Sequence, residues 1–218
     1  MGKNILVVAA TAKEIEPFLE IVRQNSGLIA GHTIDVLISG IGLTSATYHL
    51  SRQVILKRSQ LIIQAGVAGC FDKKMALGSV VAVKQDTIAD ESVIELKKLK
   101  TIFDLKLVPQ NKFPYSGGWL INKNNVLSKI KLKKVKGISV NQITSSKQVI
   151  AFYKNDFDPV VESMEGAALH YVASSEKIPF IQLRSISNYI GERNKKNWDM
   201  KNAIINLNKE LIRLLENI

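Results

Sequence analysis

The segment that decides the fold is PFIQLRSISN, residues 179–188. Its first half is a largely apolar run, which is typical of a strand buried on both faces of a parallel sheet. Its second half, from Arg184 to Asn188, brings a guanidinium, hydroxyls and an amide to the end of that strand. Because open α/β sheets bind ligands outside the carboxyl ends of their strands, we expect a ligand site there. A second segment, VVESMEGAA at 160–168, adds two carboxylates at the start of an apolar helix.

Strands and helices are predicted to alternate along the rest of the chain. Apolar and β-branched runs predict strands at 4–9, 33–38, 61–65, 79–83, about 136–143 and 180–186. Periodic apolar spacing predicts helices just after Thr11, at about 43–57, at 164–176 and at about 198–216. This alternation predicts an α/β fold, a single domain over residues 1–218, with a twisted, mixed and largely parallel central sheet flanked by helices. The least regular part, 86–135, is expected to form loops that shape the pocket.

Composition narrows the function classes. The chain has 218 residues, of which 46% are hydrophobic, and no apolar run reaches the 18 to 20 residues of a membrane span. Cys70 is alone, so neither an intrachain disulfide nor a zinc cluster is expected, and a cytoplasmic location fits best. The net charge of +11 comes from basic residues spread along the chain, and the densest patch, 129–136, is interrupted by apolar residues. With only 6% aromatic residues and no nucleic-acid motif, we expect neither nucleic acid nor a membrane as partner.

Glycine-bearing turns are predicted after three strands. They are SGIG at 39–42, GVAG at 66–69 and the Glu165–Gly166 junction, and glycine lets a backbone approach a ligand closely. Each is also compatible with a plain corner between a strand and a helix. The first departs from the dinucleotide fingerprint at its third glycine, which disfavours a nicotinamide cofactor.

The order and spacing of five segments resemble one superfamily. They are 10–16 (ATAKEIE), 39–42, 66–69, 162–165 and 184–188. Along nearly its whole length the chain resembles the 5′-methylthioadenosine/S-adenosylhomocysteine nucleosidases of the nucleosidase and nucleoside phosphorylase superfamily. The motifs at 162–168 and 184–194, with Trp198 soon after, are most similar to the futalosine hydrolases of menaquinone formation. The resemblance implies a phosphorylase/hydrolase-like fold, hydrolysis of a small-molecule nucleoside, no metal or organic cofactor, and a homodimer or higher homo-oligomer.

The resemblance also assigns roles to residues. It implies that Glu165 holds the ribose hydroxyls, that Met164 packs against the sugar, and that Glu14 binds the attacking water as its base. Arg184 would help to hold that water and the adjacent carboxylate, and Asn188 would recognise the base. The substrate-binding residues expected with them are Gly40, Gly66, Val67, Ala68, Gly69, Met164 and Ser187.

Each role has a plain structural alternative. Glu14 also has capping-box spacing from Thr11, and Arg184 can be a structural ion-pair partner. Glu165 in a first helical turn favours the helix dipole in any protein, and Met164 can simply fill the core. For Glu162, a solvated or loop-ordering role is at least as favoured as contact with a ligand.

Asn188 separates two substrate classes. Where this chain has an amide, the methylthioadenosine enzymes carry an aspartate, and where it has Val67 they usually carry serine. An amide NH₂ donates to N7 or O6 of a 6-oxopurine but cannot exchange donor and acceptor roles by protonation. Hypoxanthine, the base of futalosine, therefore suits Asn188 better than adenine, and a methylthioadenosine/S-adenosylhomocysteine nucleosidase is the alternative. A non-catalytic nucleotide- or nucleic-acid-binding protein is a more distant one.

The loop after the first strand favours hydrolysis over phosphorolysis. It reads ATAKE at 10–14, which is acidic where the related phosphorylases bind phosphate, and the first arginine comes only at Arg23. For the benzoate of futalosine the cationic candidates are Arg193, Lys195 and Lys196. The run FPYSGGW, 113–119, is expected to form either a lid over that group or an ordinary turn.

Overall fold

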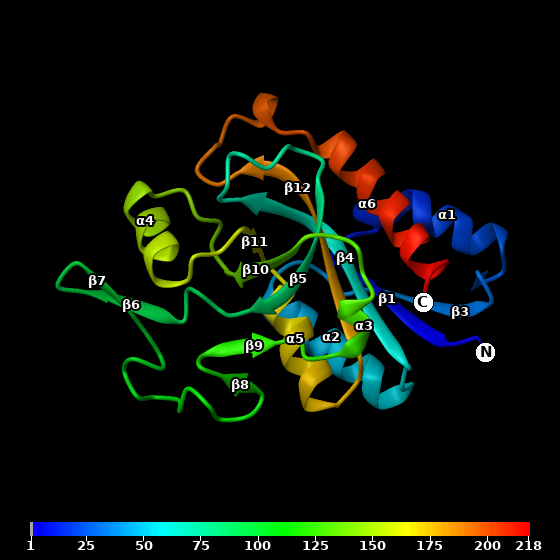
Figure 1. Ribbon diagram of the computed structural model, residues 1–218, viewed down its shortest axis with the longest axis horizontal. Coiled ribbons are helices and arrows are strands. Elements are labelled where there is room, and N and C mark those ends of the chain that lie inside the picture. The colour runs from blue at the N-terminus through cyan, green and yellow to red at the C-terminus, as the bar shows by residue number, and fades with distance from the viewer. Residues whose placement is uncertain (1) are drawn as a thin grey trace.

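Ten strands form one mixed sheet in the computed structural model, which describes residues 2–218 (Figure 1). Their order is β2-β3-β1-β4-β11-β10-β5-β9-β8, and β12 pairs with both β4 and β5. The bounds are β1 (Asn4–Ala9), β2 (Leu28–Ile29), β3 (His32–Ile38), β4 (Leu61–Cys70), β5 (Val80–Asp86), β8 (Tyr115–Ser116), β9 (Trp119–Ile121), β10 (Lys134–Ser139), β11 (Val161–Ser163) and β12 (Phe180–Tyr189). A separate hairpin joins β6 (Ser92–Glu95) to β7 (Lys98–Thr101) and extends away from the body in Figure 1.

Part of this sheet closes on itself. Strand β4 pairs with β11, β11 with β10, β10 with β5, and β5 with β12, which returns to β4. The pairings β1–β3, β1–β4 and β4–β12 are parallel, whereas β4–β11 and β5–β12 are antiparallel. The ring forms because β4 and β12 are each ten residues long and continue past the point where β1 ends.

Helices cover both faces of the sheet. They are α1 (Glu16–Gln24), α2 (Leu43–Leu56), α3 (Asn125–Ser128), α4 (Lys147–Asp156), α5 (Gly166–Ser175) and α6 (Met200–Leu215), with 3₁₀ helices at Ala12–Ile15 and Lys195–Asn197. In Figure 1, α1 and α6 lie on one side of the sheet, and α2 and α5 lie on the other.

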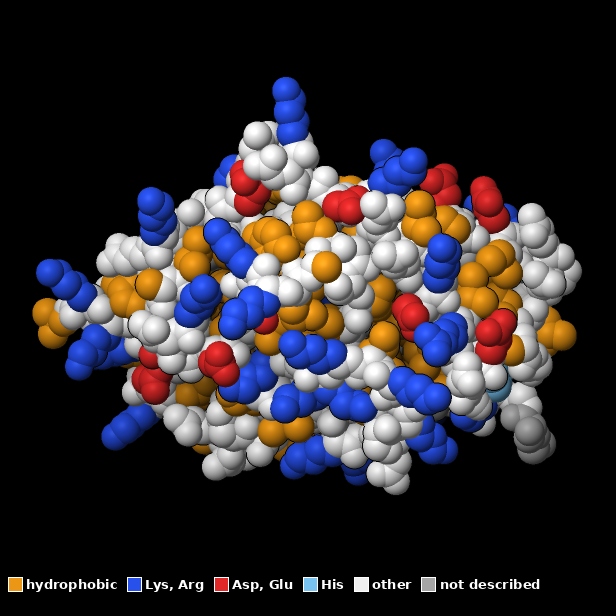
Figure 2. All heavy atoms as spheres, turned by 45° about the horizontal axis from the view of Figure 1, so that its top comes forward, with side chains coloured by type: hydrophobic (Ala, Val, Ile, Leu, Met, Phe, Trp, Pro, Cys, Tyr) orange, Lys and Arg blue, Asp and Glu red, His pale blue; other side chains and the backbone are white. Residues whose placement is uncertain are grey.

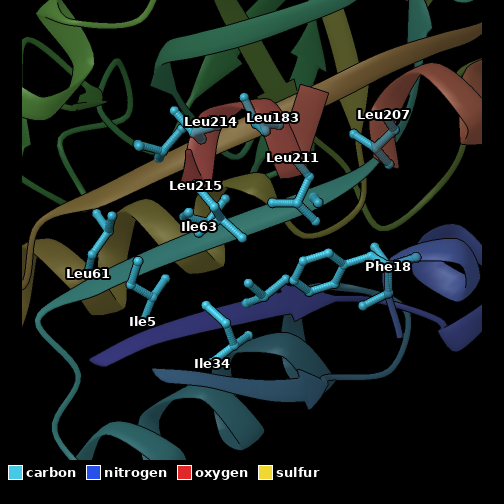
Figure 3. Packing of buried hydrophobic residues seen from close by; sticks show 14 of the residues in the cluster. Ile5, Phe18, Ile34, Leu61, Ile63, Leu183, Leu207, Leu211, Leu214 and Leu215 are labelled. Carbon is cyan, nitrogen blue, oxygen red and sulfur yellow. The ribbon is translucent and has the colours of Figure 1, made fainter. Parts of the chain in front are cut away.

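Alternate residues of β1 explain the two-sided core. Ile5 and Val7 pack in the cluster that includes Phe18 of α1 and Leu211 of α6, whereas Leu6 packs in the cluster formed with α2 and α5. Figure 3 shows the first cluster, in which the leucines of α6 lie over the strands. A continuous apolar strand is therefore what two covered faces require, and the predicted α/β fold with a flanked mixed sheet is confirmed.

Several predicted boundaries were wrong. Residues 66–69 do not form a turn, because they belong to β4, and β12 extends past the predicted end at 186 through Asn188 to Tyr189. Strand β10 ends at Ser139 rather than near 143, and beyond it the backbone N–H of Asn141 donates to the carboxylate of Asp90 (2.6 Å) instead of to a neighbouring strand. Strand β11 and helix α4 were not predicted.

The charged surface is dispersed. In Figure 2, Lys and Arg side chains are spread over the visible face, with apolar and neutral atoms between them. Within residues 2–218, no helix combines the length and the apolar character needed to cross a bilayer.

Candidate active site

A pocket of about 290 Å³ lies where β1, β4, β11 and β12 reach the same edge of the sheet. Its polar lining comes from residues at or just after the ends of these strands. Its apolar lining consists of Ala10, Ile41, Val67, Ala68, Ile143, Met164, Ile190, Trp198 and Met200, and its remaining lining residues are Thr11, Glu14, Gly69, Glu162, Ser163, Glu165, Ser187 and Asn188. The predicted ligand site at the carboxyl edge therefore coincides with a real cavity.

Glu14 serves both the helix start and the pocket. Its Oε2 accepts from the backbone N–H and the hydroxyl of Thr11, each at 3.0 Å, which is the predicted capping interaction. Its Oε1 accepts from the backbone N–H of Val67 at 3.0 Å. The side chain is 9% exposed and lines the cavity. Capping thus fixes the carboxylate in the pocket rather than competing with a role there.

Arg184 lies beneath the pocket and does not line it. The side chain is 1% exposed, and its Nη2 donates to Oε1 of Gln64 at 2.8 Å. Its Nη1 is 3.8 Å from Oε2 of Glu165. Gly66 makes this position possible, since a Cβ there would overlap Nη1 of Arg184 and lie 3.0 Å from Oε1 of Glu14. Arg184 therefore meets Glu14 at Gly66 and pairs with Glu165, so the three charged residues predicted from distant segments form one cluster.

Glu165 is held from three sides. Its Oε1 accepts from the backbone N–H of Gly42 at 3.0 Å, and its backbone carbonyl accepts from Nε2 of Gln64 at 3.3 Å. Burial raises the pKa of Glu165, while Arg184 and the Gly42 N–H oppose the rise. Gln64 binds both Arg184 and the Glu165 backbone, so it fixes the two partners relative to each other.

Asn188 lines the same pocket from the end of β12. Its Oδ1 accepts from the hydroxyl of Ser187 at 2.9 Å, and its Nδ2 donates to the carbonyl of Tyr189 at 3.2 Å. These two contacts fix the orientation of the amide and leave one N–H of Nδ2 available. Gly69 lies next to it, where a Cβ would be 3.4 Å from Nδ2 and would overlap Ile190.

Glu162 is not solvated. It is 5% exposed and lines the pocket, and its Oε1 accepts from the backbone N–H of Thr144 at 3.0 Å. Burial raises the pKa of Glu162, and hydrogen bonding from Thr144 opposes the rise. The loop-ordering contact expected as one alternative is therefore present.

The other predicted residues divide into two groups. Val67, Ala68, Gly69, Met164 and Ser187 line the pocket, whereas Gly40 and Gly66 do not. In the 39–42 loop it is the backbone N–H of Gly42, not Gly40, that reaches a pocket side chain.

The residues expected around a benzoate differ in how near they lie to the pocket. The 113–119 run contains the β8–β9 hairpin, and none of its residues lines the pocket. Tyr115 instead packs edge-on against Tyr171 of α5, with the ring centroids 6.0 Å apart. All three cationic candidates are exposed and none lines the pocket, but Arg193 lies over the ring of Trp198, a lining residue, at 5.9 Å from its centroid.

A buried polar network behind the pocket was missed by sequence reasoning. Asp86 is fully buried, and it accepts from the hydroxyl of Ser139 (3.0 Å) and from Nε2 of Gln182 (3.2 Å). Ser139 in turn accepts from the N–H of Ala167 in the first turn of α5, at 2.8 Å. Burial raises the pKa of Asp86 to about 6. The only sequence signal was an aspartate at the end of an apolar strand, which also marks many surface turns.

Three carboxylates and one recessed cation set the electrostatics of the site. Glu14, Glu162 and Glu165 line the pocket, while Arg184 lies under it. Such a site stabilises positive charge that grows on a bound molecule and can accept hydrogen bonds from its hydroxyl groups. It disfavours a bound anion in the same place.

Fold and pocket together define an α/β enzyme with a carboxylate-lined cleft for a small molecule. The chain belongs to the phosphorylase superfamily, whose family model matches residues 4–218. A 5′-methylthioadenosine/S-adenosylhomocysteine nucleosidase of Glaesserella parasuis is 22% identical over 218 residues, covering 90% of each chain. A futalosine hydrolase of Thermus thermophilus is 25% identical over 182 residues, covering 82% of this chain and 80% of that protein. The solved futalosine hydrolase of Helicobacter pylori superposes with a TM-score of 0.80 at 22% identity, covering 99% of this chain and 98% of that one.

Proposed function

We propose that the protein is a nucleosidase that hydrolyses the N-glycosidic bond of futalosine, releasing hypoxanthine and dehypoxanthinyl futalosine in menaquinone formation. The observation that carries the proposal is that Arg184 and Glu14 meet at Gly66, that Arg184 also pairs with Glu165, and that Asn188 lines the same pocket. The relatives named above include nucleosidases of both the methylthioadenosine and the futalosine type.

The chemistry requires charges of opposite sign at the two ends of the substrate. Breaking the bond from C1′ to N9 builds positive charge on the ribose and negative charge on the purine. Glu165 binds the 2′- and 3′-hydroxyls next to the ribose, so its charge acts most strongly when the sugar becomes cationic. Met164, a lining residue, packs against the sugar.

Glu14 is the general base. Its two oxygens are already oriented by Thr11 and Val67, so the carboxylate needs no rearrangement to bind a water below C1′. It takes a proton from this water as the oxygen attacks C1′. Arg184 acts as a positioning residue, because it pairs with Glu165 and occupies the space beside Glu14. No step requires a metal or an organic cofactor.

The charge of the pocket supports hydrolysis over phosphorolysis. None of its described lining residues is a lysine or an arginine, and three are glutamates. A phosphate nucleophile would be repelled here, whereas water would be oriented and deprotonated. A cation for the benzoate must then come from the rim, and Arg193 stacked on Trp198 is the best placed of the three predicted candidates.

The amide of Asn188 selects the base. Ser187 holds its oxygen and Tyr189 accepts one of its N–H groups, so the remaining N–H is a fixed donor. N7 or O6 of hypoxanthine accepts from it. Asn188 has no proton to transfer, so it stabilises the negative charge on the leaving base by hydrogen bonding alone, and the base takes its proton from water.

A paired hydrolysis assay tests the proposal. The purified protein is incubated without phosphate with futalosine, inosine, methylthioadenosine or S-adenosylhomocysteine, and the released base is separated by chromatography. We expect hypoxanthine from futalosine and little adenine from the other two. Adenine release alone would refute the futalosine assignment, and release only after phosphate addition would refute hydrolysis.

The second candidate, a methylthioadenosine/S-adenosylhomocysteine nucleosidase, is distinguished by Asn188→Asp. An introduced carboxylate would lie near the Tyr189 carbonyl, which repels its ionised form and favours a protonated oxygen that can donate to N7. We expect the ratio of kcat/KM for methylthioadenosine to that for futalosine to rise about 100-fold. The exposed substitution Asn25→Asp is the control. An unchanged ratio would show that Asn188 does not read the base.

We also propose that the protein is a homodimer. Large apolar side chains are exposed on α2 and the loop before it, namely Ile41 (62%), Tyr48 (60%), Ile55 (75%) and Leu56 (72%). Ile41 also lines the pocket, so a partner on this face would cover the open side of the site. Light scattering should give twice the chain mass of 24.2 kDa, and Tyr48→Lys should shift it toward one chain mass. A measured mass of 24.2 kDa for the wild-type protein at micromolar concentration would contradict the homodimer.

A further inference from the structure

Glu162 carries a buried oxygen that the fold leaves without a partner. Its Oε1 is bound by the backbone N–H of Thr144, but its Oε2 has no hydrogen bond, although the side chain is only 5% exposed. No lysine or arginine among residues 2–218 forms an ion pair with it. A buried polar atom without a partner is costly, and native structures usually explain it by a ligand, a water or a function.

Glu162 and Asn188 lie on either side of a single residue of the sheet. Gly69 of β4 is paired with Glu162 of β11 on one side and with Asn188 of β12 on the other. Residues paired across neighbouring strands project to the same face of a sheet. Two interstrand spacings put their Cα atoms about 10 Å apart. All three residues line the pocket, and Ile190 covers Gly69 between them.

The two polar side chains offer complementary groups to a base lying between them. Asn188 presents a fixed N–H donor, as its other contacts require. A carboxylate at position 162 presents only acceptors. A 6-oxopurine has acceptors at N7 and O6 and a donor at N1–H, whereas adenine has an acceptor at N1.

We propose that Glu162 is a second base-selecting residue, which accepts the N1–H of a 6-oxopurine while Asn188 donates to its N7 or O6. The inference rests on the proposed function, because it assumes that the purine occupies the Asn188 side of the pocket. It goes further in assigning the choice of base to a pair of residues on two strands, rather than to Asn188 alone. Glu162 touches the base and not the reacting bond, so it acts on specificity.

The competing explanation is that Glu162 only orders the loop that carries Ile143. The Thr144 hydroxyl is also buried without a hydrogen bond, and it belongs to the residue whose N–H binds Oε1, so it is the competing donor for Oε2. Glu162→Gln separates the two explanations. The amide oxygen still accepts from the Thr144 N–H, which keeps the loop in place, while the NH₂ replaces the free acceptor with a donor.

Isothermal titration calorimetry with hypoxanthine and adenine is the test. We expect wild-type protein to bind hypoxanthine more tightly, and Glu162→Gln to reduce the ratio of hypoxanthine to adenine affinity about 100-fold, because its NH₂ opposes N1–H and suits the adenine N1. The exposed substitution Glu20→Gln should leave the ratio unchanged. Thermal melting of each variant confirms that it is folded.

Two results would overturn the inference. If Glu162→Gln changes both affinities by the same factor, or neither, Glu162 only orders the loop. If wild-type protein binds adenine more tightly, the carboxyl group does not act as an acceptor for N1–H. Free bases bind without being hydrolysed, so this test is independent of the futalosine assay. Failure of wild-type protein to cleave futalosine would refute the proposed function while the affinity ratio still reports on Glu162.

Discussion

Replacing Glu14 by glutamine is expected to lower kcat for nucleoside hydrolysis by about 10²- to 10⁴-fold, the usual contribution of a general base. Glutamine fills the same space but cannot take a proton from water. The substrate would still bind through Glu165 and Asn188, so KM should change much less than kcat. Steady-state kinetics with futalosine measures both constants.

Thr11→Ala is the companion variant for Glu14→Gln. It removes the hydroxyl that donates to Oε2 of Glu14 but leaves the carboxylate and its bonds to the Thr11 and Val67 backbone N–H groups. Loss of this capping contact should cost about 0.5–2 kcal/mol of stability, and kcat should fall much less than in Glu14→Gln, because the carboxylate that takes the proton remains. If both variants lose activity to the same extent, and in proportion to their loss of stability, Glu14 is a capping residue and not a base.

The sequence predicted those parts of the site that local patterns determine. The apolar run of β1 identified a strand covered on both faces, and Thr11 with Glu14 identified a helix start by spacing alone. Both depend on residues within a few positions of one another. The strand segment ending in Asn188 likewise placed the amide at the sheet edge, where the pocket lies.

The remaining features depend on pairings between distant segments. Gln64 reads as one polar residue in a buried strand, and only the pairing of β4 with β12 brings it to Arg184, 120 positions away. The glycines at 66 and 69 predict a turn by composition. In the structure their missing side chains instead leave space for side chains from other segments. Glu162 meets the pocket because β11 closes the ring against β4, and no local pattern encodes that closure.

Replacing Arg184 by methionine is expected to destabilise the protein by about 3–5 kcal/mol at neutral pH, because it leaves a buried carboxylate without its cation. Both side chains of the pair are nearly inaccessible, at 1% and 8% exposure, so solvent cannot compensate. Methionine keeps most of the volume, which limits the loss of packing. Urea unfolding of wild-type and variant protein measures the difference in the free energy of unfolding.

The pH dependence of this loss identifies its cause. Burial raises the pKa of Glu165 above its ordinary value of 4.5, and Arg184 opposes that rise, so removing the guanidinium raises this pKa further. When a carboxyl group has a higher pKa in the folded than in the unfolded protein, the folded protein loses stability as the pH rises from the unfolded-state pKa through the folded-state pKa. The variant should therefore differ least from wild type near pH 4.5 and most at about pH 8. Adding Glu165→Gln to Arg184→Met should recover most of the stability at the higher pH, since the carboxylate that was paired with Arg184 is then also removed. An equal loss at both pH values without recovery would show that Arg184 acts through packing and its bond to Gln64 instead.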